Sequence, residues 1–543
     1  MSDPTAPRTL LIGLDGATFT ILDPLMEQGA MPFLRELTRR GVRAELRSVV
    51  PPLTPPAWTS LLTGRTPGHH GIYDFFQLDA PGSKQIRLTT AHDMRCETVA
   101  AIANRQGLRA TMLNFPVHFP PPAIDGYVLA GWMPWRQLRL GTHPAELYDE
   151  LKRLPGFDPR ELAMDMELEA RATEGCPEDE LVDWVELHIR REQHWADVTS
   201  HLLQAHPTPL TAVLFDGPDK IQHLCWRYMD PTLLPAHPTT TEQRVHDLCV
   251  EFFRQLDRHL ATLCALVGPE ATIVLASDHG FGATTEMLHI NTWLEQAGHL
   301  AWADDARPTA GADEALGMNR LSRHTYWLDW RRTRAYAATP TSNGIHIVRA
   351  EDNDGYGVPA SDYGRFRAEL SDALRSYRDP VSGDPIVAHI WTREEVFSGP
   401  AAAWGPDLTL ALRDGGLVSI LPTSDPTGAP LVPRPRPVGA HRPLGVFLAR
   451  GPGIRQGMAF RELSILDVAP LLLYSLGLAI PDGMEGRAPL EIFQPAFRAR
   501  RPLRTIAETP MVANLPAASA SRPLDAEAEA VMLARLRDLG YIE

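Results

Sequence analysis

The chain has 543 residues, of which 44% are hydrophobic and 22% are charged, and these proportions are typical of a globular protein rather than a disordered one. Its formal net charge of −15 argues against a non-specific nucleic-acid surface, which needs clustered Lys and Arg. No secretory signal precedes the first apolar run, and no run of about 18 apolar residues occurs, so we expect no membrane segment. The five cysteines are scattered and lack paired metal spacing, which indicates reduced thiols of a cytoplasmic protein.

Three short apolar runs predict the central strands. They cover residues 9–15, 211–216 and 271–278, and each consists of aliphatic and β-branched residues without polar alternation. Such runs are typical of parallel strands that are buried on both faces. Each run ends at an acidic residue that is followed within one or two positions by Gly. Because ligand sites in open α/β sheets lie at the carboxyl ends of the strands, we expect a metal-binding rim there.

Helical patterns lie between these runs. Residues 32–40 follow the first run, residues 181–205 precede the second, and residues 244–266 lead into the third with long apolar periodicity. The alternation of strands and helices predicts an α/β fold with a doubly wound, mostly parallel sheet flanked by helices.

The domain prediction divides the chain into four parts. Residues 1–300 form the first part of a catalytic core, with a helical insertion at about 131–205. Residues 301–440 are rich in Asp, Gly and Pro, with a Pro-punctuated stretch at 431–437, and are interpreted as an irregular cap insertion. Residues 441–500 return to the core. Residues 501–543 are predicted to be a linker, to about residue 522, followed by a helix at 526–539 whose apolar side chains share one face.

Metal-ligating side chains occur where the strands are predicted to end. Asp15, Asp278 and His279 combine oxygen and imidazole donors at two of these ends. Asp219 and His223 are four residues apart, so on one helical turn both side chains point the same way and can bind one ion. Mixed Asp and His ligation suits zinc, with manganese or iron as alternatives.

Two further positions complete the candidate site. His441, far along the chain, supplies another imidazole. Asp216 is an alternative ligand, but only Asp219 has the four-residue spacing to His223. Thr54 is followed by Pro55, which suits a helix N-cap with proline at the first helical position. A hydroxyl at the positive end of a helix lies where phosphate is stabilised, and a bound metal would make it a nucleophile.

These residues resemble the alkaline phosphatase superfamily, specifically its type I phosphodiesterase/nucleotide pyrophosphatase branch. The resemblance rests on five motifs in the family's order. The closing segment of the family is similar to residues 467–470 and 486–487 of this chain. The motifs are Leu14-Asp15-Gly16, the segment from Thr54 through Thr63-Gly64 to Ile72, Pro218-Asp219 to His223, Ser277-Asp278-His279-Gly280, and the segment around His441. Counting back from Thr63-Gly64 favours Thr54 over Thr59 as the nucleophile.

The resemblance implies a two-metal site and a covalent phospho-threonine intermediate. It implies an alkaline-phosphatase-like fold with a cap insertion, and a small phosphate ester as the binding partner. One ion, most simply zinc, would be held by Asp15, Thr54, Asp278 and His279, and the other by Asp219, His223 and His441.

Two departures from the family pattern concern substrate binding. Nucleotide pyrophosphatases typically carry an Asn that contacts the phosphoryl oxygen, and Phe75 stands at the matching position here. Pro55 and Pro56 also remove two backbone N–H donors from the start of the helix. Asn114 is our candidate for a replacement donor.

Three functions follow as hypotheses. The first is hydrolysis of phosphodiesters or phosphoanhydrides, and the second is a phosphomonoesterase or phosphonate hydrolase on the same metal site. The third is a non-catalytic binding member of the superfamily, which would have lost at least one ligand, whereas all seven expected positions are filled here. The sequence contains no motif that names the leaving group or the oligomeric state.

Overall fold

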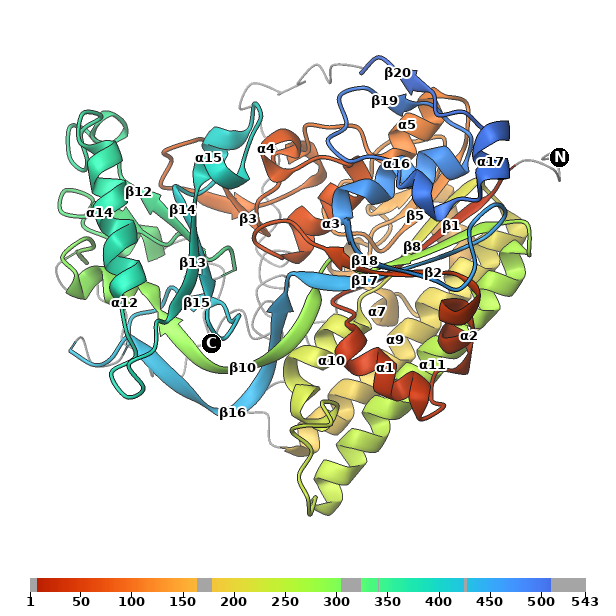
Figure 1. Cartoon of the computed structure of the whole chain (residues 1–543), viewed down its shortest axis with the longest axis horizontal. Coiled ribbons are helices and arrows are strands. Elements are labelled where there is room, and N and C mark those ends of the chain that lie inside the picture. The colour runs from red at the N-terminus through yellow and green to blue at the C-terminus, as the bar shows by residue number, and fades with distance from the viewer. Residues whose placement is uncertain (1–6, 164–177, 304–323, 340, 424–426, 509–543) are drawn as a thin grey trace.

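The computed structural model describes residues 7–163, 178–303, 324–339, 341–423 and 427–508. Figure 1 shows two bodies side by side. The larger one, here called the core, is built on a nine-stranded sheet, and the smaller one, here called the cap, contains a three-stranded and a four-stranded sheet. The predicted α/β class with a large, mostly parallel sheet is confirmed.

The central sheet brings the three predicted strands together as neighbours. In spatial order its strands are β18 (Met458–Ser464), β2 (Val42–Arg47), β17 (Leu444–Arg450), β9 (Thr272–Ala276), β1 (Thr9–Leu14), β8 (Leu210–Phe215), β5 (Ala110–Leu113), β6 (Gly126–Leu129) and β7 (Thr142–His143). The strands from β9 to β6 run parallel, whereas β17 and β7 are antiparallel to their neighbours. The carboxyl ends of β9, β1 and β8 therefore lie at one edge of the sheet.

Helices cover both faces of this sheet because its strands are apolar on both sides. In β1, Leu10, Ile12 and Leu14 belong to one hydrophobic cluster, and Leu11 belongs to the other. The first cluster packs against α1 (Phe19–Glu27), α2 (Pro32–Arg40), α9 (Glu178–Ala205), α10 (Gly217–Cys225) and α11 (Thr240–Val267). The second packs against α3 (Thr54–Thr63), α5 (Val99–Arg105) and α16 (Val468–Ser475).

The three predicted helices are confirmed, and two of them begin earlier than their apolar periodicity. The pattern at 244–266 becomes α11, which starts at Thr240 because Thr239 and Glu242 form a reciprocal capping box there, a polar signal that apolar spacing does not contain. Shorter helices complete the core: α4 (Pro67–His70), α6 (Ala145–Leu151), α7 (Pro159–Leu162) and α17 (Pro495–Arg500).

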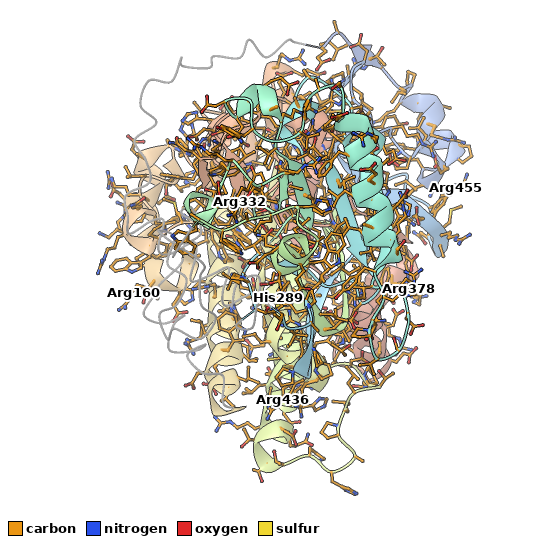
Figure 2. The ribbon with its side chains drawn as sticks, turned by 90° about the vertical axis from the view of Figure 1, so that its left-hand side faces the viewer. Arg160, His289, Arg332, Arg378, Arg436 and Arg455 are labelled. Carbon is orange, nitrogen blue, oxygen red and sulfur yellow. The ribbon has the colours of Figure 1, made fainter. Side chains whose placement is uncertain are left out.

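The cap is organised around its own sheets. Two long antiparallel strands, β10 (Gly280–His289) and β16 (Leu431–Arg442), run from the core into the cap and are joined there by β15 (Val418–Ser419). The four-stranded sheet contains β11 (Ala335–Tyr336), β12 (Gly344–Ile347), β14 (Leu408–Leu412) and β13 (Val387–Thr392). Helices α12 (Ile290–Gln296), α14 (Tyr363–Ser376) and α15 (Arg393–Val396) accompany these strands, as does the hairpin of β3 (Phe76–Leu78) and β4 (Ile86–Leu88). Figure 2 views the molecule from this side, with His289 at the end of β10.

Residues 301–440, which their composition predicts to be less regular than the core, contain several regular strands and helices in the described part of the chain. The cap has a hydrophobic cluster of its own, and its first strand begins at Gly280. The Pro-punctuated stretch at 431–437 is part of β16. β16 is an edge strand. Proline is tolerated in such a strand because it has no backbone N–H to donate, and one side of an edge strand has no neighbouring strand to receive a hydrogen bond. The pairing with β10 also shifts its register between Thr284 and Glu286, opposite these prolines.

The predicted linker begins inside the fold. Residues 505–506 form β20 (Thr505–Ile506), which pairs in parallel with β19 (Ile480–Pro481), and Arg65 forms an ion pair with Glu508. The predicted helix at 526–539 lies outside the described residues. In the part of the chain that the structure describes, no helix has the length and apolar character needed to span a bilayer.

Candidate metal centre

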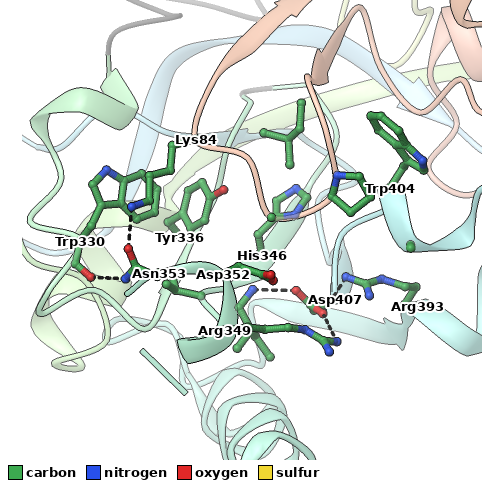
Figure 3. A pocket seen from close by; sticks show the side chains of 16 residues that line it. Lys84, Trp330, Tyr336, His346, Arg349, Asp352, Asn353, Arg393, Trp404 and Asp407 are labelled. Carbon is green, nitrogen blue, oxygen red and sulfur yellow. Dashed lines mark hydrogen bonds and ion pairs between the residues drawn. The ribbon is translucent and has the colours of Figure 1, made fainter. Parts of the chain in front are cut away.

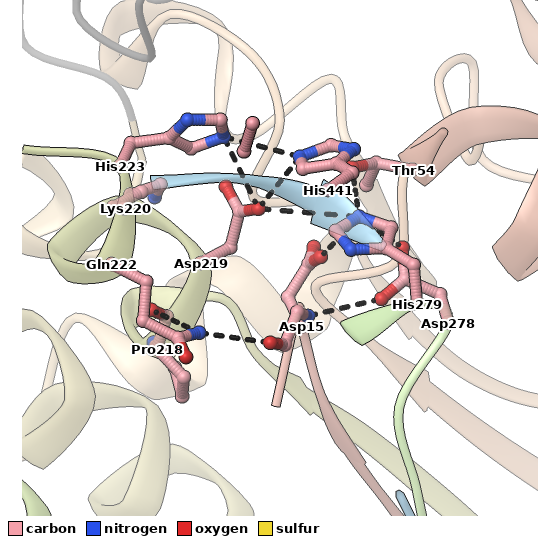
Figure 4. Close-up of polar contacts among 12 residues, drawn as sticks. Asp15, Thr54, Pro218, Asp219, Lys220, Gln222, His223, Asp278, His279 and His441 are labelled. Carbon is pink, nitrogen blue, oxygen red and sulfur yellow. Dashed lines mark hydrogen bonds and ion pairs between the residues drawn. The ribbon is translucent and has the colours of Figure 1, made fainter. Parts of the chain in front are cut away.

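The carboxyl edge of the central sheet carries the predicted ligands. Asp15 follows β1 directly, Asp278 and His279 lie between β9 and β10, and α10 with Asp219 and His223 begins just after β8. His441 lies near the end of β16, opposite Phe281 of β10. Figure 4 shows these six side chains converging with Thr54. The structure therefore brings all seven predicted ligand positions together.

One group of donors consists of Asp219, His223 and His441. The Nε2 atoms of His223 and His441 lie 3.1 Å apart, and they lie 3.4 Å and 3.2 Å from Asp219 Oδ1. Donors about 2.0–2.1 Å from a tetrahedral zinc ion are about 3.3 Å from one another. The observed separations match that value, so the three atoms could bind one such ion without rearrangement.

The second group consists of Asp15, Asp278 and His279. The Nε2 atom of His279 lies 3.2 Å from Asp278 Oδ2 and 3.6 Å from Asp15 Oδ1. Thr54 adds a fourth donor, because its Oγ1 lies 3.3 Å from the same nitrogen. The two groups adjoin each other, since this nitrogen is 4.0 Å from Asp219 Oδ1 and the rings of His279 and His441 stack with centroids 3.6 Å apart.

Both groups are buried, and their carboxylates are incompletely satisfied. None of the seven residues is more than 4% exposed. Among the described residues, none donates a hydrogen bond to Asp15 Oδ1, Asp219 Oδ1 or Asp278 Oδ2. Buried carboxylate oxygens without donors are costly. Three such atoms that face imidazole nitrogens fit a site for divalent cations.

The electrostatics of the second donor group point the same way. Burial and the facing carboxylates of Asp278 and Asp219 raise the pKa of Asp15 well above its usual value, and burial also raises the pKa of Asp278. Burial and neighbouring His441 lower the pKa of His279 well below its usual value. Carboxylates that repel one another beside neutral imidazoles are the donor set that a cation stabilises.

Backbone and side-chain contacts fix the orientation of the donors. His441 donates through Nδ1–H to the carbonyl of Pro52 at 2.9 Å, which leaves its Nε2 lone pair facing Asp219. Trp58 Nε1 donates to Asp15 Oδ2 at 3.3 Å, and the N–H of Gly16 donates to Asp278 Oδ1 at 3.1 Å. Trp58 and Pro52 carry no sequence signal of this role, because each contact depends on the tertiary fold.

Thr54 is the first helical residue of α3 rather than its N-cap. The N-cap is Leu53, which has an extended backbone. A capping hydroxyl at position 54 would need a free N–H at Pro56 or Ala57, but proline has none, and Ala57 already donates to Leu53 O at 2.9 Å. The hydroxyl of Thr54 is directed to His279 instead.

A buried charged network next to α10 was not predicted. Lys220 Nζ lies 2.6 Å from Asp216 Oδ2, and both side chains are almost fully buried. Glu192 of α9 accepts a hydrogen bond from the N–H of Gly217, and burial together with the Asp216 carboxylate raises the pKa of Glu192 to about 8. The four-residue spacing of Asp216 and Lys220 was a readable signal, whereas Glu192 lies in a helix with nothing nearby in sequence to mark it. Asp216 thus pairs with Lys220, and Asp219 faces the histidines.

Asn114 has a role within the sheet. It has a left-handed backbone with φ of 64°, which Asn tolerates better than most residues. Its Nδ2 donates to Leu214 O at 2.9 Å. These contacts account for an Asn at this position without a substrate, and the suggestion that it binds substrate stays a prediction.

Two cavities lie near the site and in the cap. A small one of about 40 Å³ has Pro55, which follows Thr54 in the sequence, together with Phe75 and Trp132 among its lining residues. The rings of Phe75 and Trp132 stack with centroids 5.9 Å apart. A separate cavity of about 200 Å³ lies in the cap, with Lys84, Trp330 and Asp407 among its lining residues (Figure 3). Neither cavity is lined by the carboxylates or histidines of the metal centre.

Comparison with known proteins agrees with this geometry. The model of the type I phosphodiesterase/nucleotide pyrophosphatase family matches residues 9–429, which is more than half of the chain. The chain belongs to this family. It is therefore an enzyme of the phosphodiesterase/phosphatase type in the alkaline phosphatase superfamily, and the family is metal-dependent.

Solved structures resemble this chain at low sequence identity. Murine ectonucleotide pyrophosphatase/phosphodiesterase 5 is 12% identical, with 90% of this chain and 100% of that chain covered and a TM-score of 0.51. Phosphonoacetate hydrolase from Sinorhizobium meliloti 1021 is 17% identical, with 87% and 95% covered and a TM-score of 0.47. The first of these likenesses establishes a common fold for the phosphodiesterase core and its cap.

Proposed function

We propose that this phosphodiesterase-family protein hydrolyses phosphodiesters or phosphoanhydrides through a covalent phospho-threonine intermediate at a two-zinc site. One ion would be held by Asp15, Thr54, Asp278 and His279, and the other by Asp219, His223 and His441. The observation that carries the proposal is the position of Thr54, whose Oγ1 lies 3.3 Å from His279 Nε2, beside the carboxylates of the second donor group. Ser60 of α3 also contacts an imidazole, but it is that of His70, which belongs to neither donor group, whereas Thr59 and Thr63 donate to backbone carbonyls.

The residues of the chain would carry the reaction in two steps. Bound divalent ions would supply positive charge for the phosphoryl oxygens and lower the pKa of the Thr54 hydroxyl. In the first step the Thr54 oxygen, having released its proton to solvent, bonds to phosphorus while the bond to the leaving oxygen breaks, and that oxygen takes up a proton. In the second step water bonds to phosphorus, the bond to Thr54 breaks, and the hydroxyl is restored. Because α3 begins at Thr54, its positive end favours the anionic substrate.

The surroundings of Thr54 favour an ester with an apolar group. Pro55 and Pro56 provide no N–H donors, and Phe75 stands where the family typically has an Asn. Phe75 and Trp132, both buried, present stacked aromatic rings in the cavity next to Pro55. A Phe75→Leu variant should retain turnover of bis-4-nitrophenyl phosphate within about threefold, whereas Phe75→Asn should lower its kcat/KM about tenfold, because it removes apolar contact with the ester. Equal rates for the two variants would contradict this assignment.

The nucleophile is tested by comparing two threonines of α3. Thr59 is as buried as Thr54, but its Oγ1 donates to Pro55 O at 2.7 Å. We expect Thr54→Ala to lower kcat/KM for bis-4-nitrophenyl phosphate by at least about 10³-fold, because the attacking oxygen is lost, and Thr54→Ser to retain measurable turnover. Thr59→Ala is the matched control and should stay within a few-fold of the wild-type rate.

Two further measurements separate the alternatives. Rapid quenching during turnover of bis-4-nitrophenyl phosphate, followed by mass analysis, should find a 4-nitrophenylphosphoryl group on the peptide that contains Thr54. Zinc content before and after chelation should track activity toward bis- and mono-nitrophenyl phosphate, and the ratio of the two rates distinguishes a diesterase from a monoesterase. Full activity in Thr54→Ala, or turnover that persists without bound metal, would overturn the proposal.

A further inference from the structure

A further cluster, of one carboxylate and two histidines, lies away from the candidate metal centre. Glu150 of α6 and His201 of α9 point at each other, with Oε1 of the carboxylate 2.7 Å from Nε2 of the imidazole. His206 follows α9 and brings its Nε2 to within 2.9 Å of Oε1 and 3.0 Å of Oε2 of the same carboxylate. The three side chains are half-buried, with 24–30% of each exposed. One carboxylate from α6 thus faces two imidazole nitrogens at the end of α9.

The elements that carry the cluster are fixed by the core. Leu147 and Leu151 of α6 and Leu202 and Leu203 of α9 are buried in the same hydrophobic cluster. The backbone N–H of His206 donates to Leu202 O at 2.9 Å, so the helical turn continues to the imidazole. The ring of Tyr127 packs against that of His206, with centroids 5.0 Å apart. The donors are therefore held in place by rigid elements, which favours a preorganised site.

The chemistry of this cluster fits a borderline divalent cation. Two imidazole nitrogens and one carboxylate are a known zinc donor set, with water at the fourth position. Burial favours the protonated form of Glu150, but the hydrogen bonds from His201 and His206 outweigh it and keep its pKa below the usual value. Donors around zinc lie about 3.3 Å apart, so the side chains must separate by a few tenths of an ångström. Their partial exposure leaves room for that movement.

The cluster lies at the opposite end of the sheet from the catalytic centre. His206 precedes β8 by four positions, and Asp216 follows this strand of six residues. A strand of that length spans about 20 Å. We propose that Glu150, His201 and His206 bind one zinc ion per chain, separate from the catalytic metals, which fastens α6 to the end of α9. The catalytic proposal does not depend on this site.

Metal content of matched variants tests the site. Wild-type protein, His201→Ala/His206→Ala and the control His194→Ala are loaded with Zn²⁺, desalted and analysed by mass spectrometry for zinc per chain. His194 lies on the same helix, and among the described residues its ring bonds to the carbonyls of Arg190 and Gly156. We expect the double variant to hold one zinc ion fewer than the wild type and the control, with turnover of bis-4-nitrophenyl phosphate unchanged in all three.

A second variant keeps the test decisive if the double variant fails to fold. Glu150→Gln retains an oxygen that can accept a hydrogen bond but removes the charged ligand, so it should also hold one zinc ion fewer. Zinc should raise the Tm of the wild type by more than that of Glu150→Gln. Equal zinc content in wild type and both variants would show a purely hydrogen-bonded cluster and overturn the proposal. Because only the difference between variants is read, the result is independent of how many ions the catalytic centre holds.

Discussion

The core and the cap of this enzyme differ in architecture, yet both contribute residues to the candidate metal centre. In the core, the strands β9, β1 and β8 end at one edge of the sheet and place carboxylates and a helix there. In the cap, short strands and antiparallel pairs surround a separate hydrophobic cluster. The two long strands β10 and β16 connect these bodies, and both begin or end at the centre: His279 immediately precedes β10, and His441 lies in β16.

Under the proposed function, this arrangement makes the cap a part of the catalytic site. His223 comes from a core helix and His441 from a strand that returns from the cap, yet their Nε2 atoms lie 3.1 Å apart and face one carboxylate oxygen. A change of cap orientation would therefore move a ligand directly.

The largest effect is expected from removing one ligand of either origin. If the core and the cap contribute equally, His223→Ala and His441→Ala should each lower kcat/KM for bis-4-nitrophenyl phosphate by about 10³-fold, because each leaves a divalent ion with two protein donors. Steady-state kinetics and zinc content of the two variants measure this.

His69→Ala is the matched control for these ligand variants. His69 is half-buried and is paired with Glu485 at 3.0 Å, so the variant should keep its metal and stay within a few-fold of wild-type turnover. If His441→Ala retained wild-type activity while His223→Ala did not, the cap strand would not supply a ligand, and the equivalence of the two bodies would fail.

The core and the cap also differ in what the sequence allowed to be predicted. The core strands are continuous apolar runs, and the ligands follow them at readable positions such as Asp15 and Asp278. The cap strands are short, polar or interrupted by proline, as in β16, so their pairing depends on contacts that sequence periodicity does not contain. The position of His441 was found only because family order fixed it. The orienting contacts of Trp58 and Pro52 join distant parts of the chain and had no local signal.

A buried carboxyl links the two bodies and predicts a pH effect of intermediate size. Asp74, in the core segment after α4, accepts hydrogen bonds from the cap hydroxyls of Thr339 at 2.6 Å and of Thr341. Burial raises the pKa of Asp74 to about 6, although these hydrogen bonds oppose the shift. The folded protein therefore holds a proton that the unfolded chain releases between about pH 4 and pH 6. The free energy of unfolding should fall as pH rises through that window, in total by on the order of 3 kcal/mol.

Asp74→Asn isolates this contribution. The variant keeps one carbonyl oxygen for Thr341 and for the N–H of Phe75, which donates to Asp74 Oδ1 at 2.6 Å, and the Thr339 hydroxyl can rotate to accept from the amide. Guanidinium unfolding midpoints of the two proteins between pH 4 and pH 8 provide the measurement. The wild type should lose stability relative to Asp74→Asn as pH rises to 6 and then run parallel to it. A constant difference across the range would mean that Asp74 does not retain its proton in the fold.

The smallest effect is expected from an ion-pair network inside the cap. Arg413 lies after β14 and bonds to both carboxylate oxygens of Glu286 in β10, at 2.8 Å and 2.7 Å, and to Asp379 at 2.7 Å. Because these groups are partly exposed, solvent screens them, and Arg413→Gln should lower the Tm by at most about 2 °C. Its turnover should stay within about twofold, since Glu286 is seven residues from His279 along β10. If turnover fell as far as in His441→Ala, the stiffness of β10 would be transmitted to the metal ligands, and the cap would act on catalysis through its rigidity as well as through the ligand that it supplies.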